Sequence, residues 1–168
     1  MEPTVKPWEN EPNDLAFIAT SGLDCRIHRN LWAGNLCGYV KVPEGHLLYG
    51  KGYSAAIPDE LRSAWTAVCN GEIGKRGIID VFTCGSEGRV GVLFDVHGGI
   101  TWADNRLPWE DKTPTGWWLG FDCAHDGDLS PGYENRFSSD GEYRDIEYVK
   151  AECESLASQI VALNGATK

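Results

Sequence analysis

Apolar residues recur with the period of an α-helix along the last part of the chain, from Tyr143 onward. The apolar positions are Ile146, Val149, Cys153, Leu156, Ile160 and Leu163. Asn164 and Gly165, which follow them, are residue types that commonly end a helix. A helix of this kind is stable in water only when its apolar stripe packs against another part of the chain. The pattern therefore predicts a long terminal amphipathic helix that lies across a sheet.

Strand patterns earlier in the chain supply that sheet. Leu23, Cys25 and Ile27 alternate with polar residues, and the stretch "CGYVKV" alternates again after the turn-like "WAGN", which predicts a β-hairpin. Three further runs, rich in β-branched or aromatic residues and bounded by glycine, also predict strands. They are "GIIDVFTC" (77–84), "RVGVLFDV" (89–96) and "GWWLGFDC" (116–123).

A short helix is predicted between these strands. Pro58 suits a first helical position, Asp59 and Glu60 suit the positive end of the helix dipole, and apolar residues follow with helical spacing in "PDELRSAWTAVCNG". The predicted fold class is therefore α+β, with a mainly antiparallel sheet, a short middle helix and a long C-terminal amphipathic helix packed on it.

Length and composition predict one domain. The chain has 168 residues, 42% of them hydrophobic, which is enough for one core. Prolines and carboxylates in residues 1–14 predict an extended leader, followed by a single globular α+β domain over 15–168. No apolar run is long enough to span a bilayer and no secretion signal is present, so we expect a soluble, intracellular protein with reduced cysteines.

The charge of the chain restricts its partners. The formal net charge is −10 at pH 7, and a surface with this average field repels nucleic acid, so no direct nucleic-acid binding is expected. The same field could imitate a nucleic-acid backbone and occupy a basic groove on another protein. The carboxylates are scattered along the sequence, so that alternative stays open beside others.

Two similar segments carry the residues best suited to chemistry. In "VLFDVHGG" and "LGFDCAHDGD", Phe-Asp ends a hydrophobic run and a histidine follows shortly afterwards. If the two runs are neighbouring strands, their ends bring together the predicted catalytic residues, which are Asp95, His97, Asp122 and His125. Imidazoles and carboxylates suit acid–base catalysis. They also suit a divalent metal, with His97, His125, Asp122, Asp126 and Asp128 as candidate ligands.

The same residue types also build turns without any chemistry. An Asp at a strand end often accepts hydrogen bonds from turn amides, and "HGG" and "DGD" are ordinary turn sequences. Cys123 beside a histidine could form a thiolate nucleophile, but a cysteine directly after an apolar strand is more often buried and inert. No P-loop and no nucleophile elbow is present. The cofactor, if there is one, stays undefined.

Other residues are candidates for ligand binding. His46 and Tyr49 lie together in "VPEGHLLYGKGY" and could line a pocket, although a histidine that anchors a loop is the alternative. Trp102 and Trp118 flank the two segments described above and could stack on a planar ring, although core packing also explains tryptophans.

The segments "GYVKVPEGH", "HGGIT", "WWLGFDCAH" and "YRDIEYVKAE" occur in this order along the chain. Together they resemble a group of small hypothetical proteins of bacteriophages and prophages. This resemblance implies a viral accessory protein in the cytoplasm of the infected bacterial host. Arg144, in the last segment, is a further candidate for ligand binding, and it could instead pair with one of the strand-end aspartates and hold it in place.

Three hypotheses about function follow. The first is a phage accessory protein, active against host defence, whose His/Asp pocket binds or hydrolyses a small phosphorylated ligand such as a nucleotide immune signal. An enzyme of this kind would be a phosphoesterase-like hydrolase. The second is an acidic inhibitor of a host defence protein, without catalysis, and the third is a structural or virion-associated protein. The sequence does not define the oligomeric state.

Overall fold

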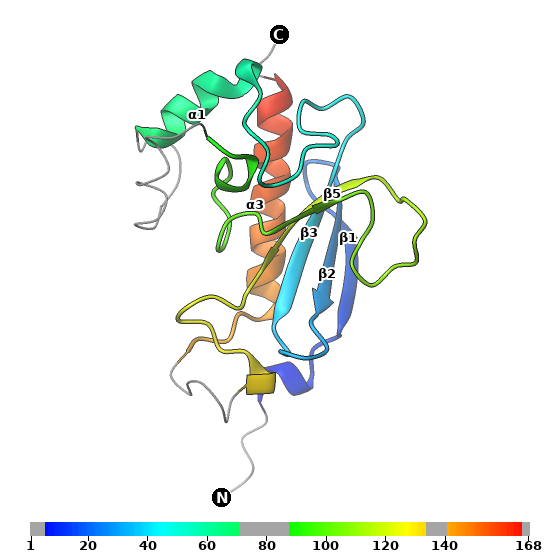
Figure 1. Ribbon diagram of the computed structural model, residues 1–168. Helices are drawn as coiled ribbons and strands as arrows, with labels where there is room; N and C mark the ends of the chain where they lie inside the picture. The colour runs from blue at the N-terminus through cyan, green and yellow to red at the C-terminus, as the bar shows by residue number, and fades with distance from the viewer. Residues whose placement is uncertain (1–5, 71–87, 134–140, 166–168) are drawn as a thin grey trace, which may run out of the picture.

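The computed structural model describes residues 6–70, 88–133 and 141–165. Figure 1 shows a sheet with one long helix laid against it. The strands pair antiparallel throughout, in the spatial order β1-β2-β3-β5-β4. The elements are β1 (Asp14–Ile18), β2 (Asp24–Arg29), β3 (Leu36–Val42), α1 (Arg62–Cys69), β4 (Trp102–Asp104), β5 (Trp117–Asp122) and α3 (Ile146–Gly165). The predicted α+β class is confirmed.

The hairpin predicted from alternation is formed by β2 and β3. Cys25 and Ile27 point into the core with exposures of 0% and 1%, and their polar neighbours face outward. Strand β3 is buried over almost its whole length, because it lies in the middle of the sheet between β2 and β5. The predicted strand in 116–123 is β5, which pairs with β3 from Cys37 opposite Asp122 to Val42 opposite Trp117.

Helix α3 packs on β2 and β3 and completes the main core. Its apolar stripe is buried as the periodicity predicts, with Val149, Cys153, Leu156 and Ile160 at 0% exposure. The helix approaches the sheet closely at Gly38 of β3. A Cβ atom at Gly38 would meet the ring of Phe121 and would lie 2.7 Å from Cys153 Sγ. The absence of a side chain at this position therefore sets the distance between the two layers.

The start of α3 is fixed by polar contacts. The Asp145 carboxylate caps the helix by accepting the Tyr148 backbone N–H at 2.8 Å. Glu11 accepts the Ile146 N–H through Oε1 at 3.0 Å and pairs with Arg29 through Oε2 at 2.9 Å. The composition of residues 1–14 did not indicate that one of them, Glu11, would bind the start of the terminal helix. The proposed division into a leader and one domain stays a prediction.

The strand predicted over 89–96 is wrong. Arg89 forms one isolated bridge with Ala56, and Val90–Val92 is a 3₁₀ turn. Val90, Leu93 and Phe94 are all buried. Their spacing of three and then one residue fits a chain that turns and does not fit the alternation of a strand. Conversely, the segment between His97 and β5, in which the sequence patterns predict no strand, contains the short edge strand β4. The strand predicted over 77–84 lies outside the described residues.

The middle helix is confirmed as α1, preceded by a 3₁₀ turn over Asp59–Leu61. Its apolar face is buried through Leu61, Trp65 and Val68. Cys69 at its end is disulfide-bonded, so the expectation of reduced cysteines is wrong at this position. Among the described cysteines, the free ones are Cys25, Cys37, Cys123 and Cys153, and all of these are buried. Among the described residues, no helix is long and apolar enough to cross a membrane.

Replacement of Gly38 by alanine should destabilise the fold, because the added methyl group overpacks the contact with Phe121 and Cys153. The expected loss is about 1–3 kcal/mol in the free energy of unfolding, measured by denaturant titration. Gly52→Ala is the matched control, since a Cβ there meets nothing within 4 Å. Equal stability of the two variants would contradict the close approach of α3.

Candidate functional site

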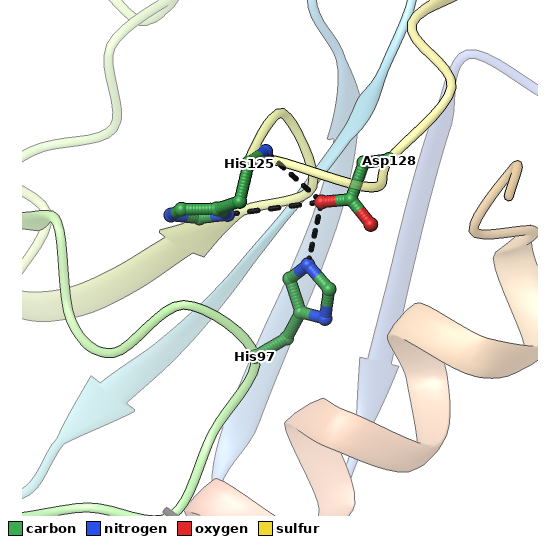
Figure 2. Close-up of side chains that lie close together, drawn as sticks. All are labelled: His97, His125 and Asp128. Atoms are coloured by element: carbon green, nitrogen blue, oxygen red, sulfur yellow. Dashed lines mark hydrogen bonds and ion pairs between the residues drawn. The ribbon is translucent and has the colours of Figure 1, made fainter. Parts of the chain in front are cut away.

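His97 and His125 meet, as the likeness of their two segments predicts. Their ring centroids lie 5.4 Å apart with an interplanar angle of 67°. Figure 2 shows both imidazoles beside the carboxylate of Asp128, with His97 on the loop that precedes β4 and His125 on the loop that follows β5. One nitrogen of each ring and one oxygen of Asp128 all lie within 4.8 Å of one another.

Asp128 is the residue around which this centre is built. Its side chain is 2% exposed, and its Oδ2 accepts hydrogen bonds from His97 Nε2 at 2.7 Å and from the His125 backbone N–H at 3.0 Å. Its Oδ1 accepts one from Arg144 Nε at 3.0 Å. Burial raises the pKa of the Asp128 carboxyl, but these hydrogen bonds outweigh burial and hold the pKa below its ordinary value. Asp128 is therefore an ionised carboxylate at neutral pH.

His97 is held on every side by helix α3 and by Asp128. Because Asp128 can only accept, His97 Nε2 donates to it, and Nδ1 accepts from the Tyr148 hydroxyl at 2.9 Å. The backbone N–H of His97 donates to Glu152 Oε2 at 2.7 Å. Tyr148 and Glu152 lie one turn apart on α3, so the helix fixes both the backbone and the ring of His97.

His125 is placed by shape more than by hydrogen bonds. Its ring lies over Gly98, whose φ is +66°. A Cβ atom at Gly98 would collide with the His125 ring, at 2.0 Å from Cε1, 2.2 Å from Nε2 and 2.5 Å from Nδ1. Its side chain is 35% exposed, but Nδ1 is buried and makes no hydrogen bond with the described residues. Nδ1 lies 3.8 Å from Asp128 Oδ2 and 4.0 Å from Asp122 Oδ1.

The surroundings of the centre are acidic. Asp122 accepts the Thr101 hydroxyl at 2.8 Å and stays 34% exposed. Arg144 is the basic group that reaches the centre, and it also pairs with Glu142 at 2.7 Å. The hydrogen bond to Asp128 raises the pKa of Arg144, so this guanidinium stays charged. Arg144 was predicted to hold a strand-end aspartate, but the aspartate that it holds is Asp128, which lies beyond the end of β5.

Two carboxylates predicted for the site do not enter it. Asp95 interacts with α3 through its backbone, because its N–H donates to Gln159 Oε1 and its carbonyl accepts from Gln159 Nε2. The carboxylate that orients His97 is that of Asp128 instead. Asp126 is exposed and does not belong to the group of potential metal ligands, and neither does Asp122.

Of the five residues predicted to bind a ligand, Arg144 lies at the centre, where it pairs with Asp128, and the other four lie in other parts of the molecule. His46 is 4% exposed, and Tyr49 lines a separate surface groove of about 640 Å³ together with Lys41 and Pro43. Trp102 and Trp118 pack in a second apolar cluster with Cys37, Tyr39 and Leu107. Core packing therefore accounts for both tryptophans.

Cys123 does not have the properties of a nucleophile. Its side chain is 2% exposed, and burial raises the pKa of its thiol, with a further increase from the nearby charge of Asp128. A thiol in this environment is protonated at neutral pH and is shielded from substrates. The chemistry of the centre therefore depends on its imidazoles and carboxylates.

Sequence reasoning missed Tyr148 and Glu152, and it assigned Asp128 only a minor place. Both helix residues flank the predicted apolar stripe, directly before Val149 and Cys153. Their spacing of four on the rim of a buried helix face was the available signal. The orientation of that rim toward His97 depends on how α3 crosses the sheet, which periodicity does not determine.

In comparisons with known proteins, no family model matches the chain, and no curated protein and no solved structure matches it. What the centre can do is therefore inferred from its own side chains.

His46 is expected to make stability depend on pH. Its Nδ1 accepts the Leu48 N–H and its Nε2 donates to the Ile160 carbonyl, so the folded protein needs the neutral ring. Burial lowers the pKa of His46 from 6.5. Its contribution is therefore complete above the unfolded pKa and is lost as pH falls below it.

The free energy of unfolding should consequently decrease between about pH 7.5 and about pH 5.5, and should decrease less in His46→Gln. Denaturant titrations of both proteins across this range measure the difference. The same slope in both proteins would contradict the prediction.

Proposed function

We propose that the protein binds and hydrolyses a small phosphorylated ligand, such as a nucleotide, at the centre formed by His97, His125 and Asp128. The observation that carries the proposal is the meeting of two imidazoles on one buried carboxylate. Imidazoles exchange protons near neutral pH, and a carboxylate that orients one of them is a common arrangement in acid–base catalysis. The more exposed of the two, His125, faces the ligand.

The two histidines have different roles in this proposal. His125 accepts a proton from the attacking water, the oxygen of that water bonds to phosphorus, and the bond from phosphorus to the leaving oxygen breaks. His125 then gives this proton to the leaving oxygen, while His97, which donates from Nε2 to Asp128 and accepts from Tyr148 at Nδ1, holds Asp128 in position beside His125. Asp122, beside His125, orients the exposed imidazole.

The biological setting follows from the resemblance of four segments to proteins of bacteriophages and prophages. It supports an accessory protein that acts in the cytoplasm of an infected bacterium. A nucleotide used as an immune signal is a ligand of the proposed chemical class, and its removal would act against host defence.

Incubation of the purified chain with a panel of cyclic and linear nucleotides, followed by mass spectrometry, tests this activity. We expect turnover of at least one member, and its loss in His97→Gln and in His125→Gln. Gly98→Ala should reduce turnover roughly 100-fold, because the added Cβ displaces the His125 ring.

Gly22→Ala is the matched control for Gly98→Ala. Both glycines have positive φ, +89° and +66°, so both variants carry backbone strain, but only Gly98 has the His125 ring within reach of a new Cβ. Gly22→Ala should therefore lose stability and keep its turnover. Equal loss of turnover in the two variants, or no turnover by the unmodified chain, would overturn the proposal.

A second candidate function, an acidic inhibitor of a host protein, is favoured by one surface feature. Leu31 and Trp32 in the turn between β2 and β3 are 82% and 87% exposed. The turn itself is ordered, because the Asn30 side chain accepts the backbone N–H groups of Trp32 and Ala33. A rigid turn that presents a tryptophan is suited to anchoring a protein partner.

The inhibitor function predicts a complex in bacterial lysate that survives purification on the tagged chain. Trp32→Ala should abolish this complex, since loss of an aromatic anchor costs about 2 kcal/mol or more, and high salt should weaken it. His125→Gln should leave it unchanged. If the complex forms equally well with the Trp32→Ala variant, this turn is not the binding surface.

A further inference from the structure

The atoms that meet at Asp128 have the spacing of metal ligands. Zinc with four ligands at about 2.0–2.1 Å separates neighbouring ligand atoms by roughly 3.3 Å. Asp128 Oδ2 lies 2.7 Å from His97 Nε2 and 3.8 Å from His125 Nδ1, so the observed distances lie on either side of that value. Changes of roughly half an ångström in these two distances, with a closer approach of the two imidazole nitrogens, which lie within 4.8 Å of one another, would place all three atoms around one ion.

The Nδ1 atom of His125 points to the same conclusion independently. It is buried, it has no hydrogen bond with any described residue, and it lies between Asp122 and Asp128. A buried nitrogen without a partner costs about 1–3 kcal/mol. A bound cation would use its lone pair and would balance the negative charge on both sides of it.

The residues behind the ligands are arranged as outer partners of a metal site. Arg144 holds Asp128 through Oδ1, and Oδ2, which also accepts the His125 backbone N–H, would exchange its hydrogen bond from His97 Nε2 for the ion. The Tyr148 hydroxyl can accept as well as donate, so it can hold the His97 ring when Nδ1 carries the proton and Nε2 is free to coordinate. Partners of this kind fix the tautomer and the orientation of metal-binding imidazoles.

The charge of the centre also requires a cation when the ligand is an anion. Asp122, Asp128 and Glu152 contribute negative charge within this small volume, and Arg144, already paired with two carboxylates, is the nearby positive group. A phosphate group would therefore be repelled unless an ion bridges it to the carboxylates.

We propose that His97 Nε2, His125 Nδ1 and Asp128 Oδ2 bind one divalent transition-metal ion of the zinc type, with a fourth position open to solvent. Two imidazoles favour such an ion over magnesium or calcium, and the exposure of His125 and Asp122 leaves the open side that zinc enzymes keep for water or substrate. This site deepens the proposed function and rests on it for the phosphorylated ligand that the ion would hold.

Titration of the chelator-treated full chain with Co²⁺ tests the site directly. We expect one equivalent to bind, with visible absorption typical of four-coordinate cobalt, and Zn²⁺ to displace it because zinc binds such ligands more tightly. His125→Gln should weaken Co²⁺ binding by roughly 100-fold or more, since loss of an outer partner alone costs about 10- to 100-fold. Asp128→Asn should do the same.

The variants are chosen so that a folding defect does not obscure the result. His125→Gln removes a ring whose Nδ1 has no hydrogen bond with any described residue, so the side-chain network around Asp128 is kept. His28→Gln is the matched control, because His28 also pairs with an aspartate, Asp14, but lies away from the centre. Its Co²⁺ affinity should equal that of the unmodified chain. Absence of saturable binding at one equivalent, or unchanged affinity in His125→Gln, would overturn the proposal.

The two proposals can fail separately. Binding of Co²⁺ without turnover of any nucleotide would support the metal site and overturn the hydrolytic function. Turnover by a chelator-treated chain that binds no Co²⁺ would overturn the metal site and leave the acid–base function in place.

Discussion

The close contact of helix α3 with strand β3 at Gly38 sets the position of the helix, whose side chains Tyr148 and Glu152 hold His97. Because no Cβ separates the layers, Cys153 reaches the sheet and Phe121 packs beside it. With Cys153 pointing inward, the residue before it on the helix points along the edge of the sheet. Glu152, and Tyr148 one turn earlier, thereby reach His97 at the place where β5 ends. The packing that forms the core therefore also brings these two helix side chains to the site.

The buried carboxylate of Asp128 is the second constraint, because its burial is unfavourable by itself. Removal of a carboxylate from water costs several kcal/mol unless hydrogen bonds and opposite charge replace the lost hydration. Arg144 supplies the charge, and His97 with the backbone of His125 supplies the hydrogen bonds. The lowered pKa of Asp128 indicates that this replacement outweighs burial. A turn that only reverses the chain does not need a buried charge, so this free-energy cost indicates a further role for Asp128.

Periodic patterns predicted the elements that bury one face, and they failed where burial follows another geometry. Strand β2 alternates and α3 repeats with the helical period, so their sequences specify them, whereas β3 and β5 are buried almost throughout. The run 89–96 is as apolar as a strand, but it buries Val90, Leu93 and Phe94 through turns. The meeting of His97 and His125 was predicted from two supposedly similar strand ends, although only the second belongs to a strand. Their common partner, Asp128, depends on tertiary distances that no local pattern contains.

The unequal surroundings of the two histidines restrict what the centre can do. His97 has both ring nitrogens engaged and its backbone tied to α3, so its position is set before any ligand arrives. His125 is held chiefly by the absence of a side chain at Gly98, and its Nδ1 makes no hydrogen bond with the described residues. A purely structural network would be expected to give that nitrogen a partner, because an unsatisfied buried nitrogen is unfavourable. A binding centre has a reason to leave it free, since one fixed and one available imidazole beside a carboxylate form a site prepared for a cation or a proton.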